Sequence, residues 1–191
     1  MNNKSNNSIY KKLATRSLAL LFAFGMVSCT DDDDNPMEVL EEEVITTMNV
    51  TLTANGSTVT LQSKDLDADG PNAPETTITG NFLANTTYTG SIELLNETVT
   101  PIEDVTEEIE EKKEEHQFFF TTTGSVDNVT YNDEDADNNP IGLSFTLTTG
   151  DSGSGSIQIT LRHEPKKPND GSLADAGGET DIAQTFTITV Q

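Results

Sequence analysis

Apolar and polar residues alternate with a period of two along most of the chain from about residue 44 onward. This period is typical of β-strands that bury one face. Residues 48–52 and 59–61 both show it, and Asn55 and Gly56 lie between them. Asparagine followed by glycine is preferred in two-residue hairpin turns. The sequence therefore predicts a β-hairpin over residues 48–61.

Seven further segments show the same alternation and are predicted to be strands. They are marked by Ile78 and Phe82 with Gly80 on the same face, Tyr88 to Leu94, Phe118 and Phe120, Val129 and Tyr131, Ile141 to Leu147, Ile157 to Leu161, and Phe186 to Val190. Short strands with threonine on the polar face and frequent turns are typical of antiparallel sandwiches. We predict an all-β domain over residues 44–191, an antiparallel immunoglobulin-like β-sandwich of about nine strands. A small β-barrel is the alternative, because alternation does not determine whether a sheet closes.

Two segments interrupt the strand pattern. Residues 105–115 are rich in glutamate and follow Asp104, with Glu108 placed four residues before Lys112. A carboxylate at the N-cap and a Glu to Lys pair at this spacing favour a helix, so we predict one short acidic helix on the surface or across one end of the sandwich. Residues 172–181 contain Gly177 and Gly178 and are predicted to be a loop.

The N-terminus carries the features of a secretory signal. Basic residues precede an apolar run from Leu18 to Val27, which is too short to span a membrane, and Cys29 follows it. Residues 26–29 resemble the lipobox of bacterial lipoproteins. That resemblance implies a signal peptide over residues 1–28 and fatty acyl chains on Cys29, which is the only cysteine. An ordinary secreted protein with a cysteine near the cleavage site is the alternative.

An acidic block follows the cysteine. Asp31, Asp32, Asp33 and Asp34 predict a solvated, flexible tether, which we extend over residues 29–43. The block also resembles the acidic export signal of Bacteroidetes surface lipoproteins. This resemblance implies that the protein is anchored in the outer membrane and faces the cell exterior. The alternative is a lipoprotein that faces the periplasm.

The formal net charge of −23 restricts the partners of the chain. A protein this acidic repels nucleic acid and anionic lipid head groups. Neutral, cationic or metallic partners are therefore expected.

The two histidines are the first candidates for a metal site. His116 lies beside Glu115 at the end of the acidic segment, and His163 lies beside Glu164 at the end of a predicted strand. Imidazole and carboxylate together suit zinc or another divalent first-row metal. Two unrelated surface histidines are the alternative, because nothing in the sequence brings them together.

Two aspartate-rich turns are candidates for weak calcium binding. Asp65, Asp67 and Asp69 alternate as in the first half of a calcium loop, and Asp133, Asp135 and Asp137 repeat the spacing. Neither turn has a glutamate at the twelfth position, so an EF-hand is not expected. The alternative is that both are plain acidic turns.

Four short strings extend a resemblance over nearly the whole domain. They are residues 114–120, 139–143, 161–165 and 176–181. These strings are similar to a family of small Bacteroidetes outer-membrane lipoproteins, often labelled "type 1 periplasmic binding fold superfamily protein". The label names a two-lobed α/β structure, whereas this chain lacks repeated βα units. No particular biochemical activity follows from this resemblance.

The sequence is interpreted as a non-catalytic binding module. Gly150 to Gly153 includes a serine, but no histidine and aspartate accompany it in matching motifs, so we expect no enzymatic activity. The favoured function is a surface-exposed outer-membrane lipoprotein that captures a cation, such as zinc or calcium, or a small nutrient beside a TonB-dependent transporter. The alternative is a structural or adhesive cell-surface module without a small ligand.

Overall fold

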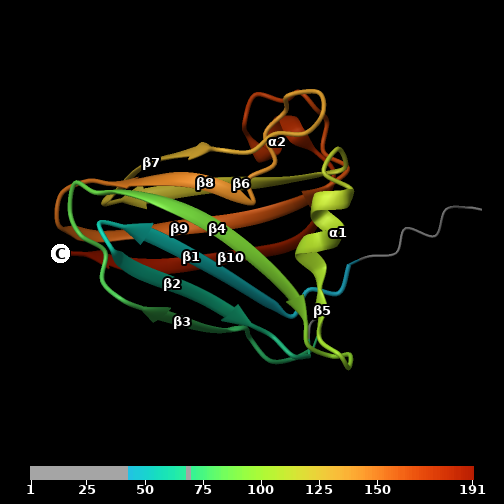
Figure 1. Cartoon of the computed structure of the whole chain (residues 1–191), viewed down its shortest axis with the longest axis horizontal. Coiled ribbons are helices and arrows are strands. Elements are labelled where there is room, and N and C mark those ends of the chain that lie inside the picture. The colour runs from blue at the N-terminus through green and yellow to red at the C-terminus, as the bar shows by residue number, and fades with distance from the viewer. Residues whose placement is uncertain (1–42, 68–69) are drawn as a thin grey trace, which may run out of the picture. The chain divides into compact units, whose positions relative to one another are not determined.

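A computed structural model describes residues 43–67 and 70–191 as ten strands and two helices (Figure 1). The predicted signal peptide, Cys29, Asp31 to Asp34 and the predicted tether up to residue 42 lie outside the described residues.

Two antiparallel sheets make up the domain. The larger has the order β3-β2-β1-β4-β8-β7, with β5 paired to β4. Its strands are β1 (Thr47–Ala54), β2 (Ser57–Lys64), β3 (Glu75–Thr79), β4 (Thr87–Asn96), β5 (Glu103–Asp104), β7 (Val126–Tyr131) and β8 (Ser144–Thr149). The smaller has the order β10-β9-β6 and consists of β6 (His116–Gly124), β9 (Gly153–His163) and β10 (Glu179–Val190).

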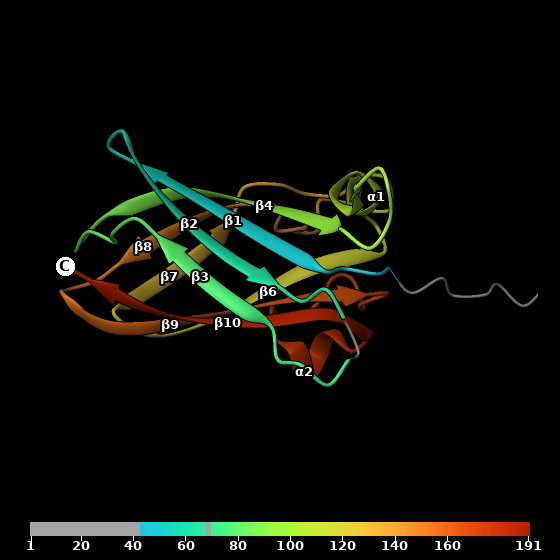
Figure 2. The same ribbon diagram turned by 90° about the horizontal axis from the view of Figure 1, so that it is seen from below.

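The sheets form two layers around one apolar core (Figure 2). Met48 and Leu52 of the larger sheet and Phe118 and Ile159 of the smaller one are fully buried in this core. Apolar residues of both sheets face inward because burial of their side chains is the main driving force for folding. The all-β sandwich is confirmed, and the described strands do not close into a barrel.

The predicted hairpin over residues 48–61 is confirmed. β1 pairs with β2 from Thr47 opposite Lys64 to Ala54 opposite Ser57. Asn55 and Gly56 form the turn with φ values of 51° and 79°. Positive φ at both central residues matches the twist of the strands, which is why this dipeptide fits the position.

The other seven predicted strands are present, with three differences from the prediction. β5 has only two residues, too few to show alternation. β3 ends at Thr79, and Ile78 on it is 37% exposed because β3 is an edge strand. The predicted loop over residues 172–181 is partly wrong, since β10 begins at Glu179 and a short helix, α2 (Leu173–Ala176), precedes it.

The predicted acidic helix is present but shorter than residues 105–115. Helix α1 spans Val105–Glu111, and Asp104 caps it by accepting a hydrogen bond from the Thr106 N–H. Its buried residues, Val105 and Ile109, face the sandwich, and turns replace the helix from Lys112 to Glu115. Neither helix in the described part of the chain has the length and apolar character that a membrane span requires.

Candidate metal centre

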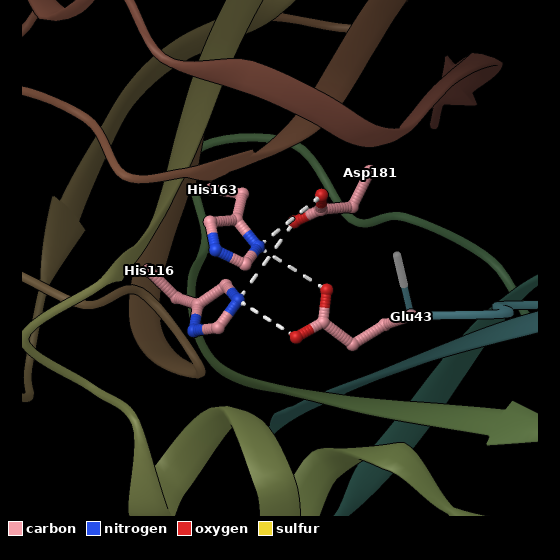
Figure 3. Close-up of side chains that lie close together, drawn as sticks. All are labelled: Glu43, His116, His163 and Asp181. Atoms are coloured by element: carbon pink, nitrogen blue, oxygen red, sulfur yellow. Dashed lines mark hydrogen bonds and ion pairs between the residues drawn. The ribbon is translucent and has the colours of Figure 1, made fainter. Parts of the chain in front are cut away.

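Four side chains meet at one end of the smaller sheet: Glu43, His116, His163 and Asp181 (Figure 3). One ligand atom from each lies within 4.8 Å of the ligand atoms of the other three. The group is nearly closed to solvent, because only the His163 side chain is more than 4% exposed, at 15%. This makes it a candidate metal centre.

The two histidines lie directly opposite each other on β6 and β9. Each histidine lies two positions from a core residue of its own strand: His116 from Phe118, and His163 from Leu161. Both histidines therefore continue the row that faces the core. Successive side chains of a strand alternate between its faces, so both imidazoles point inward, with their ring centroids 4.7 Å apart.

A β-bulge brings Asp181 to the same face. Thr180 pairs with Arg162 and Ile182 with Leu161, so Asp181 is an extra residue without a pairing partner on β9. After the bulge, the even-numbered residues of β10 face inward, from Ile182, which packs against the core, to the buried Phe186, Ile188 and Val190. Regular alternation would place Asp181 on the opposite face from Phe186, and the bulge removes that restriction.

Glu43 comes from the segment that leads into β1. The Thr46 N–H donates to the Leu95 carbonyl, so this segment is already attached to the larger sheet three residues after Glu43. The other three side chains of the group belong to the smaller sheet. A bound ion would therefore connect the two layers of the sandwich.

The separations between ligand atoms suit a small ion. Each imidazole nitrogen faces both carboxylates: His116 Nε2 lies 3.4 Å from Glu43 Oε1 and 4.0 Å from Asp181 Oδ2, and His163 Nδ1 lies 3.3 Å from Glu43 Oε2 and 3.9 Å from Asp181 Oδ1. Ligands at zinc-like bond lengths in a tetrahedron are about 3.4 Å apart. With one ligand atom taken from each residue, the four atoms lie within 4.8 Å of one another, so a contraction of at most about 1.4 Å would bring them to that spacing.

The environment of His116 leaves a lone pair directed into the group. His116 Nδ1 lies 3.0 Å from the Lys112 carbonyl oxygen, which can only accept, so Nδ1 carries the proton. Burial lowers the pKa of the His116 imidazole and favours its neutral form. Nε2 then has no proton, and neither it nor Glu43 Oε1 has a hydrogen-bond partner. A buried lone pair facing carboxylate oxygens is unfavourable unless a cation lies between them.

The Lys112 carbonyl supports the role of His116 as a ligand. Metal-binding histidines commonly donate their second ring N–H to a carbonyl or carboxylate, which fixes the ring and its tautomer. The turn after α1 supplies this acceptor, because Lys112 is the C-cap of the helix and lies four residues before His116.

A cleft of about 270 Å³ opens beside the group. Glu43 and Asp181 belong both to the group and to the lining of the cleft. The cleft therefore reaches two of the four side chains, both of them carboxylates. The full lining consists of Glu43 to Thr46, Ser63, Asp65 and Asp181 to Gln184.

The structure brings together both predicted histidines but not the glutamates beside them. Glu115 and Glu164 are exposed and lie outside the group of four. Glu115 lies in the turn before β6, and Glu164 follows the end of β9 with a positive φ of 48°, so neither belongs to the core-facing row that its histidine continues. Glu43 and Asp181 take their places, and neither was identified from the sequence.

The second aspartate-rich turn is held by donors from the protein itself. Asp133 accepts hydrogen bonds from the N–H groups of Gly142 and Ser144. Asp135 is buried, accepts from the Asn139 N–H, and forms an ion pair with Lys167 Nζ at 3.1 Å. Burial raises the pKa of Asp135, but these hydrogen bonds outweigh it and leave the pKa below its usual value.

The remaining described residues of the predicted calcium loops are more exposed or form local hydrogen bonds within their own turn. Asp137 is exposed. Asp65 Oδ1 accepts from the Asp67 N–H, and Asp67 Oδ2 accepts from the Asn72 side chain. A side-chain hydrogen bond with Asp65, and after it the one from the Asn72 side chain, lower the pKa of Asp67. Asp69 lies outside the described residues.

The donor set of the metal centre consists of two imidazoles and two carboxylates. Such a set suits zinc and neighbouring first-row divalent ions better than calcium, which prefers six to eight oxygen ligands. No protein-family model, no curated protein and no solved structure matches this chain.

Proposed function

We propose that this chain is a lipid-anchored outer-membrane protein whose β-sandwich binds a divalent first-row metal ion, with zinc as the reference ion. Glu43, His116, His163 and Asp181 are its four ligands. The anchor and the outward placement rest on the resemblance of the N-terminal segment to lipoprotein signals. The metal site rests on the geometry of the four side chains.

The observation that carries the proposal is the pair of buried atoms without hydrogen bonds. His116 Nε2 and Glu43 Oε1 lie 3.4 Å apart and face each other. Two acceptors in this position repel each other, and an ion bound to both would turn the repulsion into attraction. The high negative charge of the chain would also raise the local concentration of cations.

A capture role agrees with the accessibility of the site. The cleft reaches two of the four ligands, and Glu43 lies on a segment that precedes the first strand. An ion bound here would be held at the cell surface, where a transporter in the outer membrane could accept it.

Metal titration of the full-length chain in detergent tests the proposal. We expect one zinc ion per chain by elemental analysis after dialysis, and saturable heat in calorimetry. Glu43→Gln and Asp181→Asn should each weaken binding by at least about tenfold, since loss of one ligand removes a metal bond. Glu115→Gln and Glu164→Gln are the matched controls and should bind like the unmodified chain. Binding unaffected by Glu43→Gln or Asp181→Asn would show that the ion lies elsewhere, and no stoichiometric metal would overturn the proposal.

A further inference from the structure

Lys112 contacts two of the four proposed ligands in different ways. Its carbonyl accepts the hydrogen bond from His116 Nδ1, and its ammonium Nζ lies 4.0 Å from Glu43 Oε1. The backbone group prepares the site for a cation, whereas the side chain brings a positive charge to the same place. These two contributions can be separated, because a substitution changes only the side chain.

We propose that the Lys112 ammonium lowers the metal affinity of the site, and that Glu108 limits this effect by holding the ammonium away from Glu43. The inference rests on the proposed metal site. It assigns to Lys112 and Glu108 the control of how tightly the ion is held.

The geometry places the ammonium between two carboxylates. Lys112 Nζ lies 2.6 Å from Glu108 Oε1, four residues earlier on α1, and 4.0 Å from Glu43 Oε1. The Glu43 side chain is only 2% exposed, whereas those of Lys112 and Glu108 are 44% and 40% exposed. The lysine can therefore change partner without unfolding any part of the core.

A metal ion and the ammonium compete for Glu43. Both are attracted to Oε1, and they repel each other when both are near it. The repulsion between a divalent ion and an ammonium about 6 Å away, in a water-like dielectric, corresponds to about a tenfold change in affinity. Solvent and salt reach Lys112, so the change should become smaller at high ionic strength.

The consequence is an exchangeable ion. Four ligands from the protein in a nearly closed site would hold a divalent metal tightly. A nearby ammonium weakens the complex and can neutralise Glu43 when the metal leaves. An intermediate metal affinity of this kind suits a protein that captures an ion and then releases it.

Two substitutions with opposite effects test the inference in the full-length chain. Lys112→Gln removes the positive charge and should tighten zinc binding about tenfold in competition with a chromophoric chelator. Glu108→Gln releases the ammonium toward Glu43 and should weaken zinc binding. The double variant, Lys112→Gln with Glu108→Gln, should bind zinc about as tightly as Lys112→Gln alone. Once the Lys112 ammonium is absent, Glu108 has no ammonium to hold away from Glu43.

Two controls separate local from general charge effects. Lys112→Arg keeps the charge and should bind zinc within a few-fold of the unmodified chain. Lys166→Gln removes an equal charge from a lysine that pairs with Asp175 near α2, and should leave zinc affinity unchanged. The difference between Lys112→Gln and Lys166→Gln should shrink at 1 M salt.

The outcomes distinguish this inference from the metal site itself. If the unmodified chain binds no zinc, the proposed function and the inference both fail. If it binds zinc but Lys112→Gln binds equally or more weakly, only the inference fails. If Lys112→Gln does not fold, as judged by circular dichroism, an unchanged affinity of Glu108→Gln would still overturn the inference.

Discussion

His116 and His163 lie directly opposite each other on neighbouring strands, with ring centroids 4.7 Å apart, at the end of the core-facing rows of β6 and β9. This arrangement puts two metal-binding side chains into a position that a sandwich normally fills with apolar residues. Carboxylates from another strand and from the segment before β1 complete the group. The core is therefore closed at this end by polar groups that could hold a cation.

Zinc should stabilise the domain against heat. A ligand that binds only the folded state adds about 2.7 kcal/mol at a concentration one hundred times its Kd, which corresponds to a rise in Tm of about 5 to 10 °C for a domain of this size. His116→Ala should abolish this rise because it removes a fully buried ligand. Differential scanning calorimetry with and without zinc measures the effect, and Glu164→Gln, which changes an exposed neighbour of His163, serves as the control. A zinc-dependent rise in Tm that survives in His116→Ala would contradict the assignment.

The metal-free domain should lose stability on mild acidification. Burial lowers the pKa of His116 in the folded state, so the unfolded state, with a pKa of about 6.5, binds more protons in the window between the two values. Stability therefore rises with pH in that window, falls as the pH drops below about 6.5, and becomes insensitive to this group below the folded pKa. Urea midpoints in the presence of a chelator, measured from about pH 7.5 to pH 5.5, test the direction. His116→Asn should show a shallower dependence, and equal slopes would argue against a buried neutral imidazole.

Lys167 should contribute strongly to stability. Its side chain is 7% exposed, and its Nζ pairs with Asp135 and donates to the Lys113 carbonyl at 2.6 Å. Lys167→Met leaves a buried carboxylate without its cation, and because Asp135 keeps its hydrogen bonds from the backbone, we expect a cost of about 2 kcal/mol in the free energy of unfolding.

Lys166 offers the matched control for this measurement. It also pairs with an aspartate, Asp175, but its side chain is 61% exposed. Exposed ion pairs contribute little, so Lys166→Met should change the free energy of unfolding by less than about 0.5 kcal/mol. Equal effects of the two substitutions in denaturant titrations would show that burial of the pair does not matter.

Gly90 should not tolerate a side chain. It lies in the buried row of β4 opposite Phe145, and a Cβ atom at this position would come within 2.6 Å of the Phe145 Cε2 atom. Gly90→Ala should therefore cost about 1 to 3 kcal/mol through overpacking. Ser91→Ala, on the exposed face of the same strand, should have little effect, and urea denaturation compares the two. A neutral Gly90→Ala would mean that the Phe145 ring can move aside.

Most of the fold could be predicted from the sequence, because a strand that buries one face shows alternating apolar and polar residues. Residues 48–52 and 157–161 alternate between apolar and polar, and their apolar members face the core. The exceptions also have physical causes. β5 is too short to alternate, and Ile78 is apolar but lies on an edge strand.

The metal centre could be predicted only in part. His116 and His163 each continue an apolar row at a spacing of two, a signal of an inward-directed side chain that the sequence prediction did not use. Their pairing depends on the register of β6 with β9, which the sequence does not reveal because a long stretch of chain separates them. Glu43 precedes the first strand, where no alternation marks the direction of a side chain.

Asp181 could not be predicted as a candidate ligand because of the bulge in β10. By regular alternation Asp181 and Phe186 would point to opposite faces, yet both face inward, because the extra residue between Thr180 and Ile182 shifts the register. A bulge inserts one residue and re-aims its neighbours, and no local feature of this segment predicted it.

Deletion of Asp181 should therefore separate metal binding from folding. Without this residue Thr180 and Ile182 become neighbours, opposite the neighbouring residues Arg162 and Leu161, so the register of β10 with β9 stays regular. Phe186 and the rest of the core-facing row keep their partners, and we expect the free energy of unfolding in chelator to change by less than about 1 kcal/mol. Zinc binding should fall as far as in Asp181→Asn, since both variants lack the same carboxylate. If the deletion variant unfolds while Asp181→Asn stays folded, the bulge is required for the fold itself.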